Sequence, residues 1–331
     1  MNNIDRNNGL DVLKFFLCFL IICIHGPFPG KLGTFVVIFS RIAVPIFFMI
    51  SGYFYENTSS VERLKRQIYK IVKLCLSSSF VYCILYLLNN DFDAVIELFR
   101  NIKVFDILLF NVNPFKDIFW YLNAILYVII IEYLLLKIHK IELIKKYDCI
   151  FCCLLIGNLV FGVYSKNIFA RTFEIFITRN FLFCGIPFFI IGKLIRRMTI
   201  KFYSIQKCII LCLLLYIVSF VECLFSKGNG DIYLSTIFLS ITIFVIFLQF
   251  SFKNNKILDL FEYVGNKLST TIYIIHPLLI TFLNMIIPFE NKYIRLVVPF
   301  IIFIGSILFS YVIINFKRVF YVINKIKGVI V

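Results

Sequence analysis

Residues 10–25 read LDVLKFFLCFLIICIH and stand directly before a helix-ending Gly-Pro pair. The apolar run predicts a helix that crosses a membrane. At about 100° per residue, Asp11, Lys14, Cys18 and His25 fall within about 40° of one line along that helix. A charged side chain in lipid costs about 2.5–3.5 kcal/mol. We therefore expect this stripe to face a protein interior or a watery cavity and to form the wall of a site.

The rest of the chain repeats the apolar pattern. Of its 331 residues 61% are hydrophobic and 41 are Phe, with a mean hydropathy of +0.94. Such a composition excludes a soluble domain and predicts an all-α, polytopic membrane helix bundle in which successive runs approach the roughly 20 residues of a span. Ten spans are expected, at residues 10–25, 35–55, 74–89, 117–136, 149–164, 180–195, 208–225, 232–252, 270–288 and 294–316.

The net charge of +16 follows from topology. If the N-terminus is cytoplasmic, the inner segments carry roughly twice as many Lys and Arg as the outer ones, which is the positive-inside bias, and the C-terminus is cytoplasmic as well. The excess charge then favours anionic membrane lipids as partners and not nucleic acid. The 11 Cys show no zinc-like spacing, so we expect buried free thiols, no disulfide and no metal. We predict one membrane domain over residues 1–331, without a cleaved signal or a soluble domain.

Lys14 and His25 carry a recognisable spacing. Eleven positions turn a helix by about 1100°, so the two side chains are aligned, about 16 Å apart along the axis. Here the chain resembles the membrane-bound acyltransferase 3 family, whose mark is a basic residue, ten residues and then a His in the first span. The resemblance continues in order over nearly the whole chain, at residues 40–53, at Arg63-x-x-Arg66, and at residues 119–122, 179–189 and 273–277.

The resemblance implies a function. The family transfers acyl groups, usually acetyl from acetyl-CoA, to hydroxyls of saccharides or glycolipids of the bacterial envelope. Its members are multi-pass proteins of the plasma membrane. His25 would be the general base on the acceptor hydroxyl or a transient acyl carrier, because both roles need a neutral imidazole. Lys14 would belong to the same catalytic stripe.

The donor is predicted to bind at the inner face. Arg63 and Arg66 are one turn apart, and a planar guanidinium binds phosphate in bidentate fashion. Coenzyme A brings a diphosphate and a 3′-phosphate. Lys70 and Lys73 continue the same face, where ordinary lipid anchoring explains them equally well.

Four further side chains are predicted to bind the acceptor: Trp120, Arg41, Arg179 and His276. Trp120, Arg41 and His276 each have a structural alternative. Trp also belongs to the interfacial belt of membrane proteins. An intramembrane Arg can form a buried structural pair, and a His on an apolar span can make an interhelical hydrogen bond.

The sequence shows no evident carboxylate to orient His25. Asp11 lies on the right face but about 21 Å away along the helix, and its i,i+3 spacing to Lys14 also suits a neutralising pair. Glu132 and Glu222 are candidates by type. For both, an ion pair between spans is an equally good interpretation.

Two other functions remain open. Some proteins that resemble this chain, such as the membrane modules of serine racemases, are thought to move a small solute, so a transporter for a serine-like solute is one alternative. The other is a carrier that only passes acyl groups to a separate extracytoplasmic transferase. The set of Lys14, His25, Arg63 and Arg66 favours the acyltransferase, because a transporter needs neither an outer base nor bound CoA phosphates.

Overall fold

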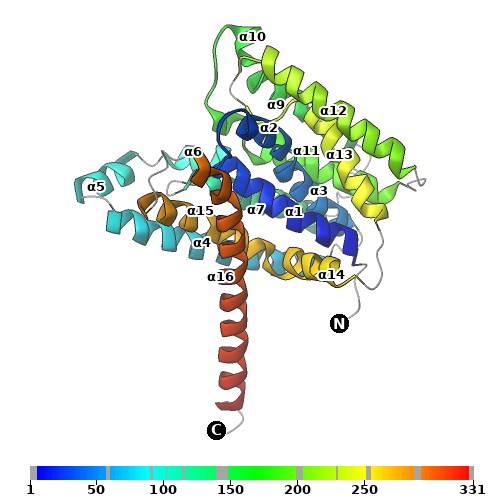
Figure 1. Cartoon of the computed structure of the whole chain (residues 1–331). Helices are drawn as coiled ribbons and strands as arrows, with labels where there is room; N and C mark the ends of the chain where they lie inside the picture. The colour runs from blue at the N-terminus through cyan, green and yellow to red at the C-terminus, as the bar shows by residue number, and fades with distance from the viewer. Residues whose placement is uncertain are drawn as a thin grey trace. The chain divides into compact units, whose positions relative to one another are not determined.

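The computed structural model describes residues 6–56, 60–89, 92–101, 103–113, 116–138, 148–198, 204–228, 230–250, 255–286 and 292–327. Every regular element in these ranges is a helix (Figure 1), which confirms the predicted all-α class. Seven helices are long and apolar enough to cross a membrane: Asn8–His25, Gly30–Glu56, Val61–Leu88, Asp117–Lys137, Ile205–Phe225, Lys256–Ile286 and Tyr293–Phe316. Each of the ten predicted spans contains helix. The helices in the predicted spans 149–164, 180–195 and 232–252 are shorter than these seven, so the number of ten crossings stays a prediction.

The chain forms two compact units. The first combines Met1–Ala43 with Thr242–Val331, and the second is Val44–Ile241. The first unit therefore brings both ends of the sequence together. The prediction of a single membrane domain refers to the whole chain and is not decided by this division.

The first unit is built around α1. Besides the end of α13 (Leu234–Gln249), it contains α2 (Gly30–Ser40), α14 (Lys256–Tyr263), the π-helical turn η4 (Val264–Leu268), α15 (Ser269–Ile286) and α16 (Lys292–Lys327). The last five of these elements all contact α1 (Asn8–His25), and α15 packs against α16 (Figure 1). Helix α1 begins where the Asn7 side chain accepts the Leu10 N–H at 2.9 Å, and it ends at Gly26. Phe15 stacks on Phe261 of α14, with ring centroids 4.1 Å apart.

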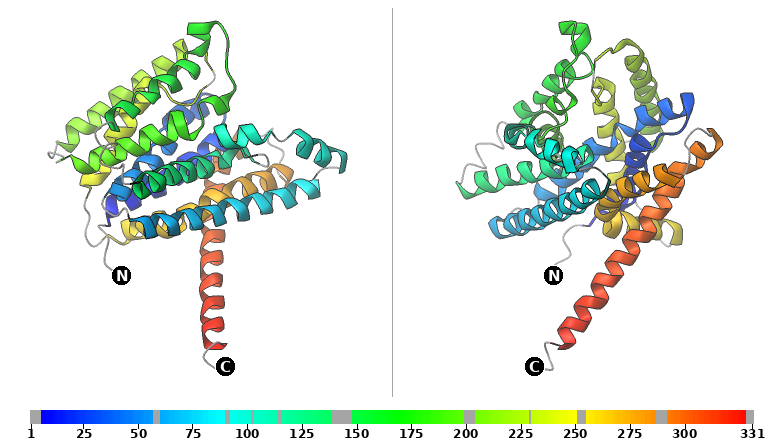
Figure 2. Two further views of the ribbon diagram at one scale, coloured as in Figure 1. Left: turned by 180° about the vertical axis from the view of Figure 1, so that it is seen from behind. Right: turned by 90° about the vertical axis from the view of Figure 1, so that its left-hand side faces the viewer.

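The second unit holds the middle of the chain. Its helices are α3 (Ala43–Glu56), α4 (Val61–Asn89), α5 (Phe92–Asn101), α6 (Val104–Phe110), η1 (Asp117–Phe119), α7 (Trp120–Lys137), α9 (Leu154–Phe161), α10 (Ser165–Phe169), η2 (Ile175–Ile177), the π-helical turn η3 (Phe181–Gly185), α11 (Ile186–Arg197), α12 (Ile205–Phe225) and the first part of α13 (Leu234–Gln249). Helix α4 runs along α7, which η3 also contacts (Figure 2).

Two glycines let α3 and α11 touch backbone to backbone. A Cβ on Gly52 would lie 1.8 Å from the carbonyl oxygen of Phe189, and one on Gly192 would lie 2.0 Å from that of Met49. Small residues at such crossings are a common device of membrane helices, because close approach increases van der Waals contact where no hydrophobic force acts between helices.

The predicted span over residues 35–55 is not one continuous helix. Helix α2 ends at Ser40, α3 begins at Ala43, and Arg41 lies in the turn between them. Pro45 explains the break. In a continuous helix its ring would clash with the carbonyl of Arg41, whereas in the first turn of α3 its missing N–H removes no hydrogen bond.

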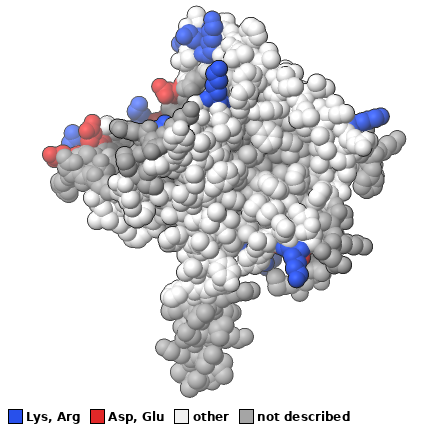
Figure 3. Space-filling model, viewed as in Figure 1, with Lys and Arg blue, Asp and Glu red and all other residues white. Residues whose placement is uncertain are grey.

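The outer surfaces of the helices suit lipid. Of the 21 residues of α12 only Ser219 is buried, and its exposed side chains include Ile209, Leu213 and Phe225. On the face drawn in Figure 3, charged side chains are sparse over the helices. Together with the long apolar helices, this surface makes the chain a multi-pass membrane protein.

The cysteines are free thiols, but they are less buried than predicted. Cys18 and Cys23 are buried, whereas Cys152 and Cys212 are half-buried and Cys153 is exposed. Cys152, Cys153 and Cys212 thus lie partly or fully at the surface. A free thiol tolerates an apolar environment there as well as in the interior.

Candidate functional site

The predicted stripe on α1 faces protein. Asp11 is 3% exposed and Cys18 is also 3% exposed, while His25 is half-buried at the last turn of the helix. The cost of placing Asp11 and Lys14 in lipid is thus avoided by turning them toward the neighbouring helices of the first unit.

Asp11 neutralises the cations at the start of α1. Its Oδ1 accepts from the Lys14 ammonium at 2.9 Å, and its Oδ2 accepts from Arg6 Nε at 3.0 Å and Asn266 Nδ2 at 2.8 Å. Arg6 also donates to Glu262 of α14. The i,i+3 pair of Asp11 and Lys14 is therefore real, and it is one part of a larger network that ties α1 to α14 and η4.

Gly265 makes this contact possible. A Cβ at this position would lie 1.8 Å from the carbonyl oxygen of Asp11. Gly265 is part of η4, a single π-helical turn, and such turns are frequent at functional sites because they redirect the residues that follow. The close approach brings Asn266 to Asp11 and sets the position of α15 against α1.

At the other end of α1, His25 meets His276 of α15. The ring centroids are 5.7 Å apart and the ring planes are tilted by 36°. His276 is fully buried, and its Nδ1 lies 3.2 Å from the carbonyl oxygen of Ile272, one turn earlier in α15. Tyr273 is the next aromatic neighbour of His276, with a centroid distance of 5.9 Å. The first unit thus joins two of the predicted site residues that are 251 positions apart.

The two candidate orienting carboxylates are already engaged within the second unit. Glu132 of α7 accepts from the Lys193 ammonium of α11 at 2.8 Å. Glu222 of α12 caps the start of α13: it accepts the backbone N–H groups of Leu234 at 2.8 Å and Ser235 at 3.1 Å, and the hydroxyl of Tyr164. Glu132 thus forms an ion pair between helices, as its structural interpretation predicted, whereas Glu222 accepts hydrogen bonds from neutral donors.

Glu132 ends a chain of alternating charges. Lys193, which pairs with it, lies 3.8 Å from Asp148 Oδ1, and the Arg197 guanidinium lies 2.7 Å from Asp148 Oδ2. Arg197 also donates to both oxygens of Glu56, at 2.8 and 3.0 Å. The hydrogen bonds to Glu56 raise the pKa of Arg197 further above its ordinary value. This chain links α3, α7 and α11 with the helix that begins at Asp148.

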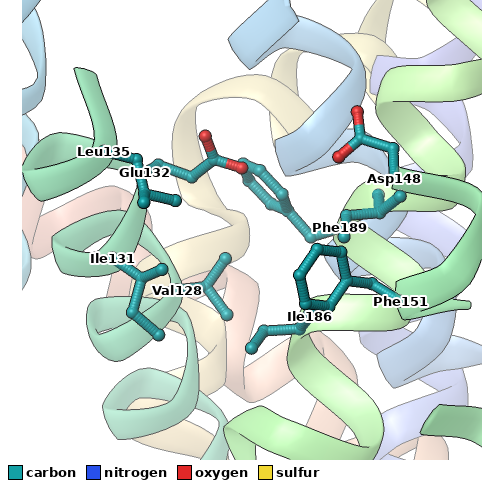
Figure 4. Close-up of a pocket in the computed structure, with 9 residues that line it drawn as sticks. Val128, Ile131, Glu132, Leu135, Asp148, Phe151, Ile186 and Phe189 are labelled. Carbon is teal, nitrogen blue, oxygen red and sulfur yellow. The ribbon is translucent and has the colours of Figure 1, made fainter. Parts of the chain in front are cut away.

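A cavity of about 200 Å³ borders this chain. Figure 4 shows the carboxylates of Glu132 and Asp148 at one end of it, with aliphatic side chains of α7 and α11, Phe189 of α11 and Phe151 around the rest. Sequence reasoning named Glu132 but not Lys193 or Asp148. Lys193 could have been recognised from the sequence, because it is a charged residue four positions before the end of an apolar helix and such a residue needs a partner.

The predicted acceptor-binding residues are divided between the two units: Arg41 and His276 belong to the first, Trp120 and Arg179 to the second. Trp120, at the start of α7, is half-buried with its ring centroid 6.3 Å from that of Phe48. Arg179 pairs with Asp231 in the second unit, a contact that the sequence did not predict. Arg41 belongs to the first unit, at the turn after α2.

Arg63 and Arg66 occupy the first two turns of α4. Arg63 is half-buried and Arg66 is exposed, in a helix that continues with exposed Lys65 and Lys70. This basic helix start keeps its guanidinium groups within reach of a ligand or of lipid phosphates, so the geometry is compatible with both interpretations.

These features define a class: a polytopic membrane helix bundle with a histidine pair at one end of its first helix and a neutralised charge network at the other. The comparison with protein families assigns it further. The acyltransferase 3 family, described as an acyltransferase domain, matches residues 7–315. The chain therefore belongs to this family.

The curated relatives carry a different name. An amino-acid racemase of Enterococcus faecalis is 25% identical over 340 residues, which cover 95% of this chain and 47% of the relative. A second amino-acid racemase of the same species is 29% identical over 208 residues, or 58% of this chain and 28% of that relative. The chain thus spans about half or less of the length of these proteins. The search of solved structures gives no match.

Proposed function

We propose that this protein is a membrane O-acyltransferase that moves an acetyl group from cytoplasmic acetyl-CoA to a hydroxyl of an envelope or exported saccharide. The observation that carries the proposal is the position of His25, half-buried at the end of α1 and beside His276, in a chain of the acyltransferase 3 family. A half-buried imidazole is held in place on one side and accessible to a substrate on the other.

The reaction needs one base. His25 takes the proton of the acceptor hydroxyl while the hydroxyl oxygen attacks the thioester carbonyl. As the C–S bond breaks and the ester C–O bond forms, the imidazolium returns the proton to the leaving thiolate. In the variant with an acyl carrier, the imidazole nitrogen attacks the thioester carbonyl first, the C–S bond breaks, and the thiolate of CoA leaves and takes up the ring proton. The acceptor hydroxyl then attacks the acyl-imidazole, the ester C–O bond forms as the C–N bond breaks, and the hydroxyl proton returns to the imidazole.

The remaining residues have binding roles in this proposal. Arg63 and Arg66 hold the phosphates of acetyl-CoA, since two guanidinium groups one turn apart match a diphosphate. Lys14 is about 16 Å along α1 from His25 and pairs with Asp11, so in this proposal it supports the site from the start of α1 and does not touch the reacting atoms. Trp120, Arg179 and Arg41 are proposed acceptor contacts.

The test compares ester-linked acyl groups on envelope glycans. A deletion strain is complemented with the wild type, His25→Ala, or His139→Ala as a matched control on the one other histidine outside the pair. We expect mass spectrometry to find acyl esters with the wild type and with His139→Ala, but not with His25→Ala. Equal restoration by all three proteins would refute the role of His25.

A second function is favoured by the curated relatives. They are named amino-acid racemases and are about twice as long as the matched region or longer, so the matched part of this family can stand beside an enzyme that acts on amino acids. A membrane module beside such an enzyme would transport an amino acid such as serine across the membrane. Uptake of labelled serine by proteoliposomes of the purified protein, together with unchanged acyl esters in the deletion strain, would replace the acyltransferase proposal with this one.

A further inference from the structure

His276 lies where an acyl-transfer site needs a group that orients its base. We propose that His276 is a positioning residue for His25: the neutral ring of His276 accepts a hydrogen bond, directly or through one water, from a ring N–H of His25. The inference rests on the proposed function for its effect on acyl transfer, but the contact itself is testable without it.

The tautomer of His276 follows from its hydrogen bond. Its Nδ1 lies 3.2 Å from the Ile272 carbonyl oxygen, which can only accept. Nδ1 therefore carries the hydrogen, and in the neutral ring Nε2 carries the lone pair. The ring of His276 thus presents an acceptor, and the neighbouring His25 ring, 5.7 Å away between centroids, supplies an N–H in its neutral form and two in its protonated form. The rings are therefore close enough for a ring N–H of His25 to reach His276 after a small shift of the side chain or through one bridging water.

The ring of His276 is held rigidly. It is fully buried, as Ile272 and Ile275 of the same helix are, and this helix packs against both α1 and α16. His25 has a different setting, since it is half-buried and its helix ends at the next residue, where the Gly26 N–H still bonds to Ile22 at 2.8 Å. A rigid partner next to a partly open one is the arrangement of an orienting group and a reacting group.

The described carboxylates of the first unit lie elsewhere. Asp11 and Glu262 bind Arg6 at the start of α1, and Asp259 is exposed on α14. In this proposal a second imidazole takes the orienting role that a carboxylate often has beside a catalytic His. In the proposed reaction, the acceptor on His276 holds the His25 ring in one orientation and stabilises its imidazolium while it carries the proton of the hydroxyl. His276 stays neutral throughout.

The contact can be observed by NMR because the chain has only three His. The protein is labelled with ¹⁵N-histidine in the His139→Gln background, so that two rings remain. His276→Phe keeps ring volume but removes the acceptor, and His276→Gln keeps an acceptor. We expect the His25 ring nitrogens to show one dominant hydrogen-bonded tautomer in the parent and in His276→Gln, and a tautomer mixture in His276→Phe.

The kinetic readout follows the same pair of variants. We expect His276→Phe to lower kcat for acyl transfer by about 10²-fold with little change in the KM for acetyl-CoA, since a misplaced base loses rate and not donor binding. His276→Gln should recover most of that loss. His276→Phe should have no further effect in a protein that already carries His25→Ala.

The outcomes separate the two proposals. Identical ¹⁵N shifts of His25 in the parent and in a folded His276→Phe protein would overturn the positioning role, whatever the activity. If instead the His276→Phe protein fails to fold, loss of the parental His25 tautomer in His276→Gln, whose side chain still accepts, would overturn it. A normal shift pattern without any acyl transfer would leave the positioning contact in place and refute the proposed function.

Discussion

Lys193 offers the sharpest test of the packing of the second unit. It is 3% exposed and lies between Glu132, which is 6% exposed, and Asp148, which is 0% exposed. Replacing Lys193 with Met keeps the length and apolar character of the side chain and removes its charge. The two carboxylates then keep their burial but lose the cation between them.

The expected cost can be estimated from the distances. At an effective dielectric constant of about 20, charges 2.8 and 3.8 Å apart attract by roughly 6 and 4 kcal/mol. Desolvation of the buried ions offsets several kcal/mol of this attraction, so we expect Lys193→Met to cost about 3–5 kcal/mol, as is typical of broken buried pairs. The double change Glu132→Gln with Lys193→Met removes both charges of the closer pair and should recover at least half of the loss.

The assay is reversible unfolding of the purified protein in mixed micelles by titration with SDS. The single Trp of the chain, Trp120, lies on α7 together with Glu132, so its fluorescence follows this unit. Lys166→Met, at an exposed position of α10, is the matched control and should change the free energy of unfolding by less than about 0.5 kcal/mol. If Lys193→Met were as stable as this control, the charge chain would not hold α7 and α11 together.

Three further predictions use the same unfolding assay. Gly265→Ala should cost about 1–3 kcal/mol, because its Cβ would overlap the carbonyl oxygen of Asp11, whereas Gly305→Ala meets only a side chain at 3.3 Å and should cost less. Glu222→Ala should cost about 1–2 kcal/mol and speed hydrogen exchange in the first turn of α13, which exposed Glu174→Ala should not do. Asp11→Leu should cost about 3–5 kcal/mol, since it removes the carboxylate paired with Lys14 and leaves Arg6 with Glu262 alone, while Asp11→Asn should cost less. Equal effects within any of these pairs would contradict the contact concerned.

Much of the fold could be predicted from local sequence. In a membrane each backbone group must bond within its own helix, so apolar runs of sufficient length predict helices without any knowledge of their neighbours. The break at Arg41 was missed although its cause is local: Pro45 can be read from the sequence, but a Pro also occurs inside α15 and α16 without dividing them. Neighbouring helices decide whether such a break is tolerated.

The candidate site was predictable only in part. The stripe of Asp11, Lys14 and His25 follows from helical periodicity, as does its direction toward protein. The role of Glu222 was not predictable, because the backbone N–H groups that it accepts belong to a different helix, and their position depends on how α12 and α13 meet.

The sequence by itself determined the class of the protein, the faces of its first helix, and a family motif that covers nearly the whole chain. Only the tertiary structure decided which distant side chains meet: His25 with His276, Lys193 with Glu132 and Asp148, and Asn266 with Asp11. The physical reason is that helix formation is governed by neighbours in sequence, whereas pairing of helices depends on the fit of surfaces such as Gly265 against the backbone of α1.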